Sequence, residues 1–153
     1  VVFKDITPLL KDPKAFQKAG EALLGLTANM KIDKVVGVDS RGFIFAPMMA
    51  EKLGAGFVTV RKSGKLPFHT VSESYDLEYG TGTLEMHSDA IEKGDKVLVH
   101  DDVLATGGTA QAVCKLVEKL GGEVVQCNFL IELTFLQGAE KIKQYQKEVL
   151  LQY

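Results

Sequence analysis

An apolar segment that leads directly into paired acidic residues and a glycine turn constrains the fold more than any other feature. Residues 96–100 read Lys-Val-Leu-Val-His, and Asp101 and Asp102 follow at once. A segment without polar alternation is typical of a strand buried on both faces of a parallel sheet. The turn Thr106-Gly107-Gly108-Thr109 comes next, and apolar residues then recur at helical spacing over 110–120. The sequence therefore predicts a strand, a tight turn and a helix, with acidic residues at the carboxyl end of the strand.

The rest of the chain repeats this alternation of strands and helices. Asp12 and Pro13 suit the N-cap and the first position of a helix, because the Asp side chain accepts from free N–H groups and Pro needs none there. A further helix is expected over 43–53, with Gly54 at its end. Further strands are expected at 34–38, 56–61, 83–87 and 123–133. This order predicts an α/β fold with a central, mainly parallel sheet flanked by helices.

One segment lacks any clear period. Residues 62–82 are largely polar and contain three glycines and one proline. Irregular segments of this length are uncommon inside compact domains and are usually functional or disordered. We therefore expect a long, flexible loop here.

Composition excludes several classes of protein. At 153 residues, with 46% hydrophobic and 25% charged residues, the chain fits one globular domain spanning 1–153. The formal net charge of −2 argues against a nucleic-acid partner. No apolar run approaches the ~20 residues of a membrane span, so we expect no membrane partner. Because the chain begins at Val1 without Met, we expect that an N-terminal segment is missing.

The two cysteines, Cys114 and Cys127, lie among apolar neighbours and match no zinc-binding spacing. We expect both to be free thiols in the core of a cytoplasmic protein.

The strand, turn and helix at 96–120 form a candidate anion site. Free N–H groups at a helix N-terminus bind anions, and small residues let a phosphate approach them. The hydroxyls of Thr106 and Thr109 can donate further hydrogen bonds. Asp101 and Asp102 would repel a phosphate unless they bind sugar hydroxyls or a metal, so a phosphorylated ribose suits both halves of the motif. The alternative is a helix after a strand with solvated aspartates, which is the better reading of either Asp alone but a poor one of the whole run.

The run 101–109 resembles the phosphoribosyl-pyrophosphate motif of the type I phosphoribosyltransferases, in the form found in members that act on adenine. Four other segments agree with that family in order and spacing. They are Val2-Phe3-Lys4-Asp5-Ile6-Thr7-Pro8, Asp39-Ser40-Arg41-Gly42-Phe43, Arg61-Lys62-Ser63-Gly64-Lys65-Leu66-Pro67 and Tyr75-Asp76-Leu77-Glu78-Tyr79-Gly80.

The resemblance implies a type I phosphoribosyltransferase fold and an enzyme of purine salvage. It would transfer the phosphoribosyl group of phosphoribosyl pyrophosphate to adenine, giving AMP and pyrophosphate, as a cytoplasmic homodimer. Mg²⁺ is implied as cofactor, bound mainly by substrate and water with no direct protein ligand. Two alternatives stay open: a transferase for hypoxanthine, guanine or orotate, and a non-catalytic regulator that senses phosphoribosyl pyrophosphate.

The resemblance also implies a role for each matched residue. The ribose and 5′-phosphate would contact Asp101, Asp102, Ala105, Thr106, Gly107, Gly108 and Thr109. The pyrophosphate would contact Asp39, Ser40, Arg41, Arg61, Lys62 and Lys65. The adenine would contact Val2, Phe3, Lys4, Leu104 and Ala105. Glu78 would be the general acid/base at an adenine ring nitrogen, and Tyr79 would cover the reacting centre.

Four residues depart from the family pattern: Lys4, Phe68, His69 and His100. Members often have Arg at the position of Lys4, glycine and a polar or acidic residue at those of Phe68 and His69, and an apolar residue at that of His100. We expect the histidines to have surface or supporting roles rather than catalytic ones. His100 could alter the electrostatics of Asp101.

Overall fold

The computed structural model describes residues 5–76 and 80–153. Their helices, 3₁₀ turns (η) and strands follow one another in the order α1 (Thr7–Lys11), α2 (Pro13–Gly25), β1 (Lys34–Val38), η1 (Arg41–Phe43), α3 (Ala46–Leu53), β2 (Gly56–Lys62), β3 (Thr70–Asp76), β4 (Thr81–His87), β5 (Lys96–Leu104), α4 (Gly108–Lys119), β6 (Glu123–Glu132), η2 (Thr134–Leu136), η3 (Gly138–Ile142) and β7 (Lys147–Gln152).

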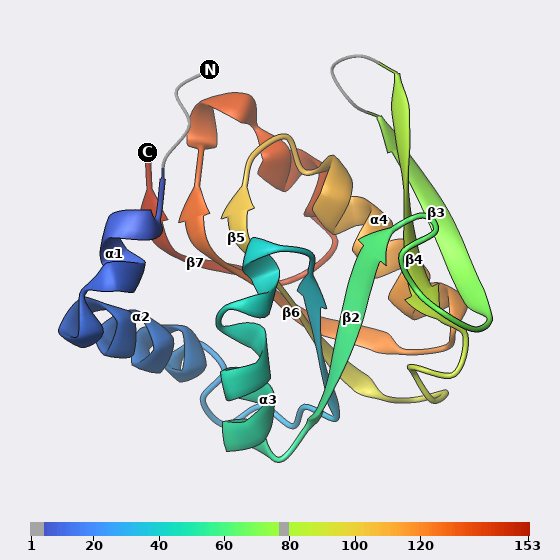
Figure 1. The fold of residues 1–153 in the computed structure, drawn as a ribbon, viewed down its shortest axis with the longest axis horizontal. Helices are drawn as coiled ribbons and strands as arrows, with labels where there is room; N and C mark the ends of the chain where they lie inside the picture. Colours follow the sequence, from blue (N-terminus) through green and yellow to red (C-terminus); the bar gives the residue numbers. More distant parts are fainter. Residues whose placement is uncertain (1–4, 77–79) are drawn as a thin grey trace.

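The strands of this described part form one seven-stranded sheet in the order β3-β4-β2-β1-β5-β6-β7 (Figure 1). β2, β1, β5, β6 and β7 pair in parallel, whereas β4 pairs antiparallel with both β2 and β3. The predicted mainly parallel α/β sheet is therefore confirmed. Because β1 and β5 are adjacent and parallel, the segments that follow them emerge at the same edge of the sheet.

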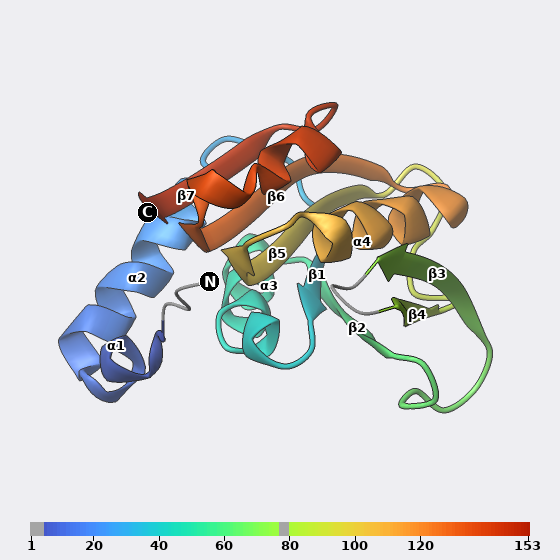
Figure 2. The same cartoon turned by 90° about the horizontal axis from the view of Figure 1, so that it is seen from above.

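Two hydrophobic cores fill the two faces of the sheet. On one face Leu23 of α2 and Met49 of α3 pack with Leu98 of β5. On the other, Val113 and Val117 of α4 pack with Val99. Figures 1 and 2 show that α2 and α3 cover one face of the sheet, whereas α4 lies on the other. No helix in the described ranges is long and apolar enough to cross a membrane.

Several local predictions are confirmed. The Asp12 carboxylate accepts hydrogen bonds from the N–H groups of Lys14 and Ala15 at the start of α2. Gly54 ends α3 with a φ of 66°, in the left-handed region that glycine tolerates best. Both cysteines are buried free thiols, and their Sγ atoms lie 3.5 Å apart between α4 and β6.

The predicted loop over 62–82 is wrong for much of its length, because β3 and the start of β4 form an antiparallel hairpin there. Val71, Glu73 and Tyr75 alternate toward the body of the protein, and Glu73 ion-pairs with Lys119 of α4 at 3.5 Å. The alternation of apolar and polar residues expected of a strand is weak here, because the inward position 73 carries a glutamate, whose charge is balanced by the distant Lys119. Figure 2 shows the hairpin beside α4.

Other boundaries also differ from the prediction. β5 continues through Asp101 and Asp102 to Leu104, because β6 offers backbone partners as far as Glu132. The helix expected from residue 43 starts as the turn η1, and α3 begins only at Ala46. α1 and β7 were not predicted. β7 has three apolar residues among its six, and its Lys147 pairs with the buried Glu132 of β6 at 2.6 Å.

Candidate active site

Two regions distant in the sequence meet at the carboxyl edge of the sheet, and they contribute three segments. They are the segment after β1, the end of β5 and the start of α4. Together with parts of β2, β3 and β4 they line a cavity of about 170 Å³. Its lining residues are Val38, Asp39, Ser40, Arg41, Lys62, Tyr75, Leu84, Asp101, Asp102 and Thr109. The structure thus brings together residues predicted for pyrophosphate with residues predicted for ribose and 5′-phosphate.

A smaller hollow of about 80 Å³ adjoins this cavity through Asp101 and Thr109. Its lining includes the turn Ala105–Gly107 and Leu104, all of which the sequence singled out. Phe129 of β6 closes it from below and was not predicted, because only the pairing of β6 with β5 brings it there.

The turn before α4 is shaped by two glycines in contact. Gly107 has a φ of 86° and is the N-cap of α4, where no side chain caps the helix. A Cβ on Gly107 would overlap the carbonyl of Gly138, and a Cβ on Gly138 would overlap the carbonyl of Ala105. η3 therefore packs directly on the turn and fixes its backbone. Because no side chain occupies the N–H groups at this helix end, they can bind an anion.

Ion pairs hold the carboxylates and the basic side chains of the site in place. Arg41 Nε lies 2.7 Å from Asp102 Oδ2, and the Asp102 side chain is only 6% exposed. Arg61 Nε lies 3.0 Å from Asp39 Oδ2. Arg61 and Lys65 do not line the cavity; they adjoin it through Asp39 and through the Lys65 carbonyl, which accepts from Arg61.

Burial and the adjacent Asp102 carboxylate raise the pKa of Asp101 well above its usual range. The Asp102 N–H donates to Asp101 Oδ1 at 2.8 Å, which partly offsets this effect. A proton retained on Asp101 would reduce the negative charge that meets a phosphate in the cavity. This is the local electrostatic coupling that two adjacent buried carboxyl groups produce.

His100 is fully buried one residue before this pair, not at the surface. Its Nδ1 lies 2.8 Å from Asn128 Oδ1, Asn128 Nδ2 donates to Gln126 Oε1, and Gln126 Nε2 donates to the backbone carbonyl of Leu26. Because that carbonyl can only accept, the chain of bonds fixes Nδ1 as the protonated nitrogen. Burial lowers the pKa of His100 to about 4, so it is neutral at pH 7.

Two groups of predicted residues cannot be located. Glu78 and Tyr79 lie outside the described residues, and so do Val2, Phe3 and Lys4. Their neighbours are placed: β3 ends at Asp76, whose carbonyl approaches Gly108 at the start of α4. Tyr75, which lines the cavity, was missed, although it belongs to the matched segment and alternates with Glu73 along β3.

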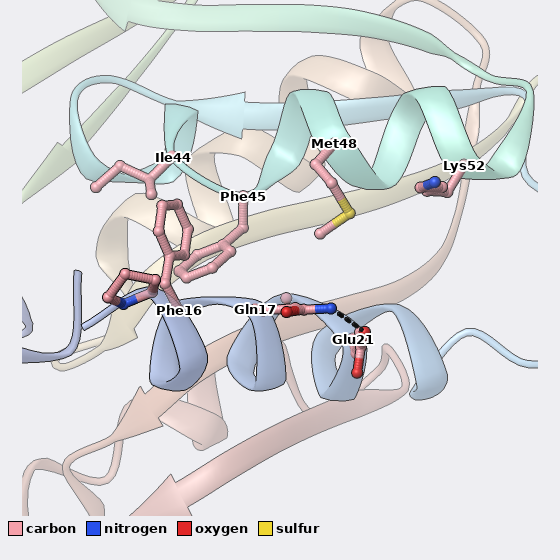
Figure 3. A pocket seen from close by; sticks show the side chains of 9 residues that line it. Phe16, Gln17, Glu21, Ile44, Phe45, Met48 and Lys52 are labelled. Carbon is pink, nitrogen blue, oxygen red and sulfur yellow. Dashed lines mark hydrogen bonds between the residues drawn. The ribbon is translucent and has the colours of Figure 1, made fainter. Parts of the chain in front are cut away.

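A larger hollow lies elsewhere in the described part of the chain. An apolar groove of about 470 Å³ runs between α2 and α3, and Figure 3 shows Phe16 of α2 opposite Phe45 and Met48 on the α3 side. Gln17 and Glu21, joined by a hydrogen bond of 3.1 Å, lie at its rim. It shares no lining residue with the cavity at the sheet edge.

Comparison with known proteins gives consistent results. The profile of the phosphoribosyl transferase domain matches residues 5–152. An adenine phosphoribosyltransferase of Christiangramia forsetii is 62% identical over 153 residues, covering 100% of this chain and 90% of the relative.

Two solved structures are similar in fold over nearly the whole chain. The adenine phosphoribosyltransferase of Rhodothermus marinus has a TM-score of 0.96 at 58% identity, covering 100% of this chain and 88% of that one. That of Saccharomyces cerevisiae, solved with adenine and an imino-altritol bisphosphate, has a TM-score of 0.89 at 41% identity, covering 99% and 87%.

Proposed function

The chain belongs to the phosphoribosyltransferase family, and on that premise we propose that it transfers the phosphoribosyl group of phosphoribosyl pyrophosphate to adenine. The products are AMP and pyrophosphate, which makes it a glycosyltransferase-type enzyme of purine salvage. The cavity at the sheet edge carries this proposal, because it combines an uncapped helix start, two carboxyl groups and a cationic segment. Each matches one part of the substrate: phosphate, ribose diol and pyrophosphate.

The ribose and its 5′-phosphate would bind between β5 and α4. N–H groups of residues 106–109 would donate to the phosphate, together with the hydroxyls of Thr106 and Thr109. Asp101 and Asp102 would hold the ribose hydroxyls. The ion pair of Asp102 with Arg41 supports this assignment, because it links the ribose side of the cavity to the pyrophosphate side through one salt bridge of 2.7 Å.

The pyrophosphate would bind to the segment Asp39–Arg41 and to Lys62, which face the same cavity. Arg61 and Lys65 would add positive charge from the flank. A guanidinium can contact two phosphate oxygens at once, so Arg41 suits a leaving group that gains charge as its bond to the ribose breaks.

The base would bind near Leu104 and Ala105 on one side and Val2–Lys4 on the other. Asp5, next to those residues, forms hydrogen bonds with Thr7 that lower its pKa, and the Arg41 guanidinium lowers it further. Asp5 is therefore close enough to Arg41 to feel its charge. This proximity supports an adenine site beside the cavity.

In the reaction, the anomeric C–O bond to pyrophosphate breaks and a C–N bond to adenine forms, through an oxocarbenium-like centre. Glu78 would accept the proton that the adenine ring nitrogen loses, and Tyr79 would cover the centre. Excluding water matters because water could capture that centre. In the sequence, Glu78 and Tyr79 both lie between strands β3 and β4, which contribute Tyr75 and Leu84 to the lining of the cavity.

Mg²⁺ fits this site as a companion of the substrate. Asp39 and Asp102 already pair with Arg61 and Arg41, and the described residues contain no cluster of three or more metal-ligating side chains. Substrate oxygens and water would therefore supply its ligands. When bound, the ion would neutralise charge on the departing pyrophosphate.

We further propose a cytoplasmic homodimer. The groove between α2 and α3 is apolar, and Phe16, which lines it, is 37% exposed (Figure 3). Such a patch supports contact with a second copy. The two free thiols support a reducing compartment. Sedimentation equilibrium tests the dimer, and Phe16→Glu should shift the wild-type mass toward that of the monomer.

The activity test uses purified protein with adenine, phosphoribosyl pyrophosphate and Mg²⁺, and measures AMP. Glu78→Gln should lower kcat about 100-fold while changing KM little, as expected for a general acid/base. Glu92→Gln, which alters an exposed carboxylate away from the cavity, serves as the matched control. A Glu78→Gln protein with unchanged kcat would remove Glu78 from the mechanism. A wild type that binds phosphoribosyl pyrophosphate without turnover would favour the regulator.

A further inference from the structure

η3 is built onto the turn that starts α4. The backbone of Gly138 packs against Ala105 and Gly107 so closely that neither glycine position leaves room for a Cβ. From α4, Gln111 Nε2 donates to the backbone carbonyl of Lys141 at 3.3 Å. These contacts hold the main chain of Lys141 over the first turn of α4.

The Lys141 side chain reaches the start of that helix. Its Nζ lies 3.9 Å from the point where a Cβ on Gly108, the first residue of α4, would be. Lys141 is exposed, and in the described part of the chain its Nζ forms no ion pair or hydrogen bond. A cation at this end of a helix is repelled by the partial positive charge of the free N–H groups.

A second observation at the same place indicates an anion. α2 begins with a capping carboxylate, Asp12, but α4 has no side-chain cap and no acidic residue in its first turn. Free N–H groups and an ammonium without a carboxylate partner in the described residues therefore lie at the same end of α4. Unsatisfied N–H groups at a helix start are unfavourable, and so is a cation beside them. One anion bound at the turn would pair with the N–H groups and with the ammonium.

We propose that Lys141 is a further phosphate-binding residue of this enzyme and contacts the 5′-phosphate of the substrate and of AMP. The proposal rests on the function proposed above, which supplies that phosphate. Lys141 lies outside every segment that the motif analysis connected with the substrate. Its contribution is a charge-assisted hydrogen bond from η3, opposite the N–H groups of α4.

Binding of ribose 5-phosphate and AMP, measured by calorimetry, tests the proposal. Lys141→Gln should weaken both by about threefold to tenfold, the range for a partly solvated charge-assisted contact. Lys141→Arg should restore binding to within about twofold of wild type, because it keeps the charge. Lys143→Gln is the matched control, an exposed lysine two residues further along, and should bind like wild type.

Two further measurements separate ligand binding from a structural role. Pyrophosphate affinity should be unchanged in Lys141→Gln, because pyrophosphate binds at the other end of the cavity. The Tm of the ligand-free variant should equal or exceed that of wild type, since a repelled cation is removed. Unchanged ribose 5-phosphate affinity, or a lowered Tm with an equal loss of affinity for ribose 5-phosphate and pyrophosphate, would overturn the role of Lys141 alone. A wild type that bound neither ribose 5-phosphate nor AMP would overturn the proposed function as well.

Discussion

The contact between Gly107 and Gly138 offers a direct test of how the phosphate turn works. Alanine at Gly107 meets two obstacles: a φ of 86°, and a Cβ 3.0 Å from the Gly138 carbonyl carbon and still closer to its oxygen. Adopting a left-handed backbone costs an alanine about 1–2 kcal/mol. The overlap adds to this, because η3 must move away from the turn.

Two other glycines separate these costs. Gly94 has a φ of 90° and nothing within 4 Å of its Cβ position, so Gly94→Ala carries the backbone cost alone. Gly138 lies outside the left-handed region, and a Cβ there overlaps the Ala105 carbonyl, so Gly138→Ala carries the overlap alone. The three variants thus form a matched set.

The assays are urea unfolding and AMP affinity. Gly94→Ala should lose about 1–2 kcal/mol of unfolding free energy and keep its AMP affinity. Gly107→Ala and Gly138→Ala should both lose at least about tenfold in AMP affinity, since displacing the turn removes charge-assisted hydrogen bonds. If Gly138→Ala bound AMP as wild type does, the idea that η3 fixes the turn would be refuted.

Three further changes test other parts of the structure. Burial lowers the pKa of His100 from 6.5 in the unfolded chain to about 4 in the folded one, so the unfolded chain binds a proton on this imidazole more readily. The contribution of His100 to the free energy of unfolding is therefore complete above pH 6.5. It falls by up to about 3 kcal/mol as the pH drops toward 4. Urea midpoints at pH 7.5 and 5 should differ less in His100→Leu than in wild type, and equal differences would contradict this. Arg41→Lys keeps the charge but loses the planar contacts, so KM for phosphoribosyl pyrophosphate should rise about tenfold; an unchanged KM would remove Arg41 from the site. Lys147→Met leaves the buried Glu132 with only Gln152 as a side-chain partner within the described chain, so unfolding free energy should fall by about 1–3 kcal/mol with KM unchanged. Full retention of stability would show that this pair contributes nothing.

Features that depend on neighbours in the sequence could be predicted from it. The Asp12–Pro13 helix start and the Gly54 helix end rest on capping, which acts over a few residues. The buried strands β1 and β5 follow from unbroken apolar runs. The candidate site was predictable because its residues lie in matched segments that parallel strands bring to one edge.

Features that depend on distant partners could not be predicted. β3 was missed because its inward Glu73 is balanced by Lys119, which lies 46 positions further along the chain. The sequence left a surface or a supporting role open for His100, because nothing local shows that Asn128, on the neighbouring strand, satisfies it. The contact of Gly138 with the phosphate turn likewise depends on the packing of η3, for which the sequence carries no local signal.

The central claim is that the cavity at the carboxyl edge of the sheet makes AMP from adenine and phosphoribosyl pyrophosphate. The most direct measurement is kcat/KM with Mg²⁺ for adenine, hypoxanthine, guanine and orotate in parallel. Adenine should exceed each other base by at least about 100-fold, the discrimination that a site built on base hydrogen bonds readily achieves. Equal or greater turnover of another base, or no AMP from adenine, would contradict the account.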